Sequence, residues 1–138
     1  MNPSLNSVQS RRLIAALLSW LVPFLIAVPF YGKNGNLLID LWLFKSIMIV
    51  VATITAAILM VWFFRAVTTA YTREAVITGL VWLVVNWVLD TVVIVSLLGM
   101  APLDYITQIG VRYLMIPAMV IAAGIIADDA AQQDKHQK

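Results

Sequence analysis

The stretch "AVITGLVWLVVNWVLDTVVIVSLLGM", residues 75–100, has the length and composition of a membrane-spanning helix and yet carries two strongly polar side chains. A helix rises about 1.5 Å per residue, so about 20 residues cross a hydrocarbon core of about 30 Å. Asn86 and Asp90 lie four residues apart and therefore on one face of this helix. By its rise along the helix, Asp90 lies roughly 10 Å inside the hydrocarbon, where an unpaired carboxylate costs about 2.5–3.5 kcal/mol. We therefore predict that the Asn86–Asp90 face turns toward protein.

The composition of the whole chain agrees with a membrane protein. Of its 138 residues, 62% are hydrophobic and 12% are charged, whereas a soluble domain is about 45–50% apolar and about 25% charged. The sequence contains no cysteine, and its single histidine is His136. These counts exclude disulfides, thiolate metal sites and an intramembrane histidine site, so we expect no cofactor and no metal. The net charge of +2 does not indicate nucleic-acid binding.

Hydrophobic runs predict four transmembrane helices within one domain, residues 1–138. The predicted spans are about 13–31, 37–64, 75–100 and 109–127, followed by a polar tail at 128–138. Short loops between them favour an all-α bundle with up-down-up-down topology. A signal peptide is the alternative for the first run, because basic residues precede it, but it lacks a clear cleavage site and further spans follow.

Basic residues in the loops predict the orientation of the bundle. One end carries most of them: Arg11, Arg12, Arg65, Arg73, Lys135 and Lys138. The first loop of the opposite end carries Lys33 alone. Since lysine and arginine are enriched in cytoplasmic loops, both termini are expected in the cytoplasm. The small size and short loops favour a bacterial inner membrane.

Three charged residues on different predicted helices occupy the same half of the membrane. Lys45 and Arg112 lie near helix ends, where either side chain alone can reach the headgroups. In a packed bundle, however, Lys45, Asp90 and Arg112 can meet. We therefore predict a buried polar cluster of these three residues with Asn86 as a bridge. It serves either as a site for an ion or small solute, or as an ion-pair network that fixes helix register.

No catalytic motif is present. The sequence contains no G-x-S-x-G, no H-E-x-x-H and no phosphate-binding loop, so an enzyme is not expected. Two functions remain open: a small, oligomeric transporter or channel that uses Asp90, and a non-catalytic subunit that stabilises another membrane protein. Asp128 and Asp129 follow the last predicted helix, as a solvated end or as a contact for a cytoplasmic partner.

Overall fold

The computed structural model describes residues 3–97 and 99–136 and is almost entirely helical. Lys138, which entered the predicted orientation, lies outside the described residues. The elements are α1 (Pro3–Ala27), the 3-10 turn η1 (Val28–Phe30), α2 (Leu41–Phe64), α3 (Tyr71–Asp90), the π-helix η2 (Thr91–Leu97), α4 (Pro102–Gln108), the 3-10 turn η3 (Gly110–Leu114) and α5 (Met115–His136). Within the described ranges, four helical segments are long and apolar enough to cross a membrane: Ser7–Phe30, Leu41–Phe64, Tyr71–Ser96 and Gly110–Asp134.

Local chemistry explains where the helices differ from the predicted spans. Helix α2 begins at Leu41 rather than near residue 37, because the Asp40 side chain accepts hydrogen bonds from the first free amides of the helix. The predicted linker after the third span forms the short helix α4, which starts at Pro102, a residue favoured in the first helical turn. The predicted polar tail continues α5 through His136.

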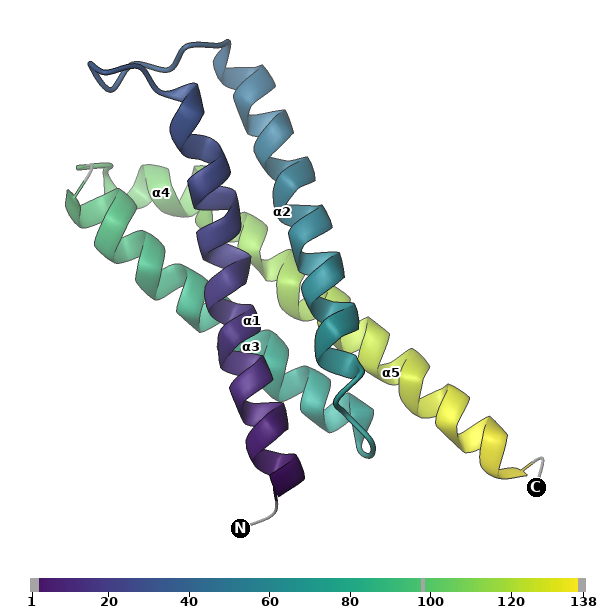
Figure 1. Ribbon diagram of the computed structural model, residues 1–138. Helices are drawn as coiled ribbons and strands as arrows, with labels where there is room; N and C mark the ends of the chain where they lie inside the picture. Colours follow the sequence, from purple (N-terminus) through teal and green to yellow (C-terminus); the bar gives the residue numbers. More distant parts are fainter. Residues whose placement is uncertain (1–2, 98, 137–138) are drawn as a thin grey trace.

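Helix α3 is the centre of the arrangement. It packs against α5 and against α1, while α2 packs against α1. Figure 1 shows α1 crossing in front of α3, with α2 alongside α1 and α5 running diagonally behind them. Two of the four spans, α1 and α5, therefore cover α3 directly.

Small residues allow α1 and α3 to come close around one large side chain. Trp82 of α3 is fully buried, and so are Ala15 and Ala16 of α1. Leu59 of α2 and Val120 of α5 complete this core. The methyl side chains of Ala15 and Ala16 leave room for the indole ring at the α1–α3 contact.

Helix α3 meets α5 with almost no space between the backbones. A Cβ atom placed on Gly79 would lie 2.8 Å from Pro117 Cα, and one placed on Gly124 would lie 2.3 Å from Ala75 Cβ. Neither distance is compatible with a side chain, so both glycines are required for this approach.

Apolar side chains cover the outside of the molecule. On α2, Trp42, Ile54 and Ile58 are 75%, 56% and 63% exposed. A soluble protein of this size rarely exposes such a continuous apolar surface. Together with the four long apolar helices, this surface supports a multi-pass membrane protein.

Candidate functional site: a polar seam between α1 and α3

Five hydrogen-bonding side chains on α3 repeat every four residues: Glu74, Thr78, Trp82, Asn86 and Asp90. Residues four apart lie one above the other on a helix, so the five form a stripe along α3. Each makes a side-chain hydrogen bond to α1. We call these five residues and their α1 partners Arg12, Ser19 and Trp20 the polar seam.

Arg12 organises the first end of the polar seam. Its guanidinium forms an ion pair with Glu74 and donates through Nε to Thr78 Oγ1 at 3.0 Å. Its backbone carbonyl accepts from Trp82 Nε1 at 3.1 Å. Arginine suits this position because its planar fork can donate to two acceptors at once. One residue of α1 thus binds three successive turns of α3.

Asn86 occupies the middle of the polar seam and is completely buried. Its amide nitrogen donates to Ser19 Oγ at 3.0 Å and to the Trp82 carbonyl at 2.8 Å. Ser19 in turn donates to the Ala16 carbonyl at 2.8 Å. The Asn86 Oδ1 atom is buried and has no hydrogen-bond partner. Asn86 therefore ties the helices together but leaves one acceptor unused.

Asp90 lies at the far end of the polar seam and is 1% exposed. Its Oδ1 atom accepts a hydrogen bond of 2.6 Å from Trp20 Nε1, and the Trp20 ring stacks on Phe24 with centroids 4.7 Å apart. Its Oδ2 atom is buried and has no hydrogen-bond partner. The carboxyl group is thus held on one side only.

Two tyrosines complete the surroundings of Asp90. Tyr105 of α4 and Tyr113 of η3 both interact electrostatically with the carboxyl group. Tyr105 is 5% exposed, and its hydroxyl has no hydrogen-bond partner of normal geometry. Burial, reinforced by the negative charge of Asp90, raises the pKa of Tyr105 above its usual value. The phenol therefore keeps its proton and remains able to donate it in a hydrogen bond.

The helix changes its period directly after Asp90. Residues Thr91–Leu97 form the π-helix η2, in which Ser96 Oγ donates to the Thr91 carbonyl at 2.9 Å. π-Helical turns are rare and occur frequently at functional sites. The next position at the four-residue spacing is Ile94, so Asp90 is the last polar member of the stripe.

The structure brings together only part of the predicted cluster. Asp90 and Asn86 face α1, as expected for an inward face. Lys45, in contrast, donates to Gln108 Oε1 at 3.2 Å and lies 5.4 Å from the centroid of the Trp42 ring. Arg112 is exposed in η3.

The predicted ion pairing of Asp90 with Lys45 and Arg112 is therefore not formed. The acid that does pair with a base on α1 is Glu74, which forms an ion pair with Arg12. The physical reason is that α1, which carries no base at that depth, covers Asp90 and offers the indole N–H of Trp20 in place of a cation.

Several residues of the site were not predicted. Tyr105 and Tyr113 lie near predicted helix ends, where aromatic residues are typical of the membrane interface. Trp20 lies inside the first predicted span, where an aromatic side chain is expected to face lipid. Arg12 was interpreted from the sequence only as one of the basic residues that set the orientation of the bundle in the membrane. The four-residue spacing continues from Asn86 back to Thr78 and Glu74 and is the signal that would have revealed the whole seam.

The donor set limits the chemistry of the site. Within the described part of the chain, no three histidine, cysteine or acidic side chains converge as a metal site would require. The Asp90 carboxyl group, with one free oxygen beside a phenolic hydroxyl, has the groups needed to hold a proton or one small cation.

Comparison of the chain with protein families, with curated proteins and with solved structures finds no match.

Proposed function

We propose that the protein is a small membrane transporter or channel, without enzymatic activity, in which Asp90 binds a proton or small cation during passage. The four spans form an up-down-up-down bundle with both termini in the cytoplasm of a bacterial cell, in one domain of residues 1–138. Arg11, Arg12, Arg65 and Arg73 at one end support this orientation, because basic residues favour the cytoplasmic side.

The main support for this proposal is that Asp90 is buried without a positively charged side chain bound to it. Among the side chains that the structure describes, no lysine or arginine forms an ion pair with the carboxyl group, and no group donates a hydrogen bond of normal geometry to Oδ2. An unpaired acid within a membrane costs about 2.5–3.5 kcal/mol. A proton or cation from outside the chain removes this cost. Intramembrane acids of this kind mark ion pathways and proton relays.

The neighbours of Asp90 have different parts in the proposal. Trp20 holds Oδ1 and fixes the direction of the carboxyl group. Tyr105 supplies a donor that can turn toward Oδ2, and Asn86 offers a free oxygen one turn away. Lys45 and Arg112 act only through their charge, because neither forms an ion pair with Asp90.

Ion flux into proteoliposomes tests the proposal. Wild-type protein is compared with Asp90→Asn, which keeps the shape and the acceptor for Trp20 but cannot lose a proton. Asp104→Asn, which changes an exposed carboxyl group of α4, is the matched control. We expect pH-dependent flux in wild type and Asp104→Asn and its loss in Asp90→Asn. Equal flux in all three proteins would refute a role for Asp90.

A second function is favoured by the outer surface of α2. This helix packs against α1, and large apolar side chains such as Ile54 and Ile58 remain exposed on it. A non-catalytic subunit would use that surface to bind another membrane protein or another copy of itself. In that case Asp90→Asn would lower the stability of the protein, and the wild type would conduct no ions.

A further inference from the structure

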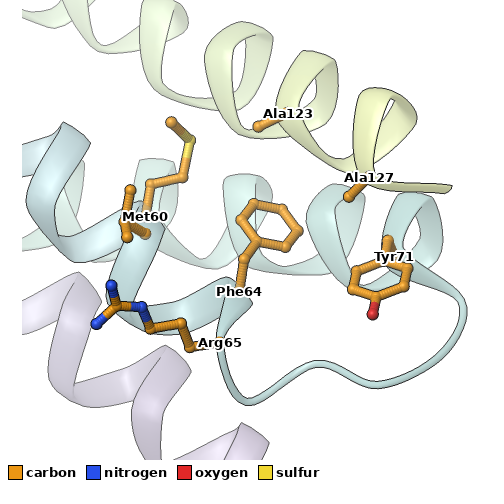
Figure 2. Close-up of a pocket in the computed structure, with 7 residues that line it drawn as sticks. Met60, Phe64, Arg65, Tyr71, Ala123 and Ala127 are labelled. Carbon is orange, nitrogen blue, oxygen red and sulfur yellow. The ribbon is translucent and has the colours of Figure 1, made fainter. Parts of the chain in front are cut away.

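A groove separates α2 from α5 near the start of α3 (Figure 2). Its volume is about 410 Å³. Seven residues line it: Met60, Val61, Phe64, Arg65, Tyr71, Ala123 and Ala127. Because α2 packs against α1, its last turns stand apart from α5 and leave this space open.

The walls of the groove are apolar and differ in shape. Met60 and Phe64 project from α2, whereas Ala123 and Ala127 give α5 a low wall opposite them (Figure 2). Both helices belong to segments long and apolar enough to span a membrane, so the groove opens toward the bilayer. An apolar space in that setting is filled by hydrocarbon, because an unfilled one loses dispersion contacts.

A basic residue lies at the mouth of the groove. Arg65 caps the end of α2, and it is exposed. Its stem lines the groove, while its guanidinium turns toward α1 (Figure 2). There, Arg11 lies 4.9 Å from the centroid of the Trp62 ring. Of these two bases, only Arg65 lines the groove, because Arg11 is held on Trp62.

The acids at this end of the bundle leave that positive charge available. Glu74 is bound by Arg12. Asp128 accepts hydrogen bonds from the Tyr71 and Thr72 backbone amides at the start of α3. Asp129 is exposed on α5 and forms no ion pair with any side chain that the structure describes. Arg65 likewise has no ion-pair partner within the described part of the chain, so its charge can attract an external anion.

We propose that this groove binds one anionic phospholipid. An acyl chain lies between Met60, Phe64 and the alanines of α5, and the headgroup phosphate lies against Arg65. An apolar groove that opens on the bilayer and ends at an unpaired base matches the two parts of such a lipid. The proposal is independent of the role of Asp90.

Native mass spectrometry of protein released from nanodiscs tests the proposal. The nanodiscs contain equal amounts of phosphatidylglycerol and phosphatidylcholine. We expect one phosphatidylglycerol molecule to remain on the wild-type protein in preference to phosphatidylcholine. Ala123→Phe fills the groove and is expected to abolish retention. Ala122→Phe places the same ring on an exposed position of α5 and should retain the lipid.

A second pair of variants tests the headgroup without altering the groove. Arg65→Gln should lower the preference for phosphatidylglycerol about fivefold. Lys33→Gln, which removes an exposed base from the first loop, should leave it unchanged. Equal retention of both lipids by wild type would overturn the proposal, and so would unchanged retention by Ala123→Phe. A dimer that Ala123→Phe dissociates would assign the groove to a second copy of the chain instead.

Discussion

The closest contact between α3 and α5 allows a quantitative prediction for Gly124→Ala. The added Cβ would lie 2.3 Å from Ala75 Cβ, 3.0 Å from the Tyr71 carbonyl oxygen and 3.3 Å from Thr72 Cα. Carbon atoms pack best about 3.5–4.0 Å apart, so the two helices must move apart by about 1 Å or more. Overpacking of this kind costs about 1–3 kcal/mol.

The displacement also reaches the start of α3. Asp128 accepts hydrogen bonds of 3.0 and 2.8 Å from the Tyr71 and Thr72 amides, and these lengthen when α5 moves away. We therefore expect Gly124→Ala to lower the Tm of the purified protein in detergent by several degrees. Thermal unfolding followed by circular dichroism measures this change.

A double-mutant cycle identifies the atoms responsible. Ala75→Gly removes the methyl group that the new side chain would strike, at a helix-propensity cost of about 1 kcal/mol. The double variant Ala75→Gly, Gly124→Ala should be more stable, by about 0.5–3 kcal/mol, than the sum of the two single changes. Ala122→Gly combined with Gly124→Ala is the control, because Ala122 faces outward. Additive effects of Ala75→Gly and Gly124→Ala would refute the proposed close contact.

Three further predictions concern the polar groups. Asp128→Ala should lower stability by about 1 kcal/mol, the usual loss for a helix N-cap, whereas Asp129→Ala should leave the Tm unchanged. Trp20→Phe removes the donor to Asp90 Oδ1 and should cost about 1–3 kcal/mol; equal Tm values for variant and wild type would contradict that bond. Tyr105→Phe should change the Tm little at pH 7, because the hydroxyl makes no hydrogen bond of normal geometry that the variant would lose. The raised pKa of Tyr105 means that the folded state keeps a proton the unfolded state loses, so wild-type stability falls as pH rises above about 10. Thermal melts between pH 8 and 11 should show a smaller fall for Tyr105→Phe.

The sequence predicts the helical class of this fold and the inward face of α3 because both depend on local patterns. Runs of about 20 apolar residues identify the spans. Asn86 and Asp90 had to face protein, whatever the neighbouring helix, because lipid offers no hydrogen bonds. The structure places both residues against α1.

The partners of these residues were not predictable in the same way. In a membrane, helices carry apolar side chains toward lipid as well as toward protein, so hydropathy does not show which face of α1 meets α3. From the sequence alone, Trp20 is expected to face lipid. Only the structure shows that its indole N–H binds Asp90. Their positive charge made Lys45 and Arg112 the predicted partners of Asp90. In the structure, α1 packs against this part of α3, so Trp20 is the partner instead.

Helix boundaries shifted for equally specific reasons. Asp40 accepts hydrogen bonds from two backbone amides and starts α2 at Leu41, a preference that hydropathy ignores. Asp128 was expected past the end of the last helix, where the helix dipole disfavours it. In the structure it remains within α5 and binds the amides at the start of α3, so its role depends on a tertiary contact.

Infrared spectroscopy of the reconstituted protein can detect directly whether the Asp90 carboxyl group exchanges a proton or cation. Difference spectra are recorded as the external pH is stepped, for wild type, Asp90→Asn and the surface control Asp104→Asn. We expect a protonated-carboxyl band that responds to pH in wild type and in Asp104→Asn and is missing in Asp90→Asn. If wild type and Asp90→Asn show the same pH-dependent carboxyl bands, Asp90 does not exchange a proton or cation. Its role is then limited to the α1–α3 interface.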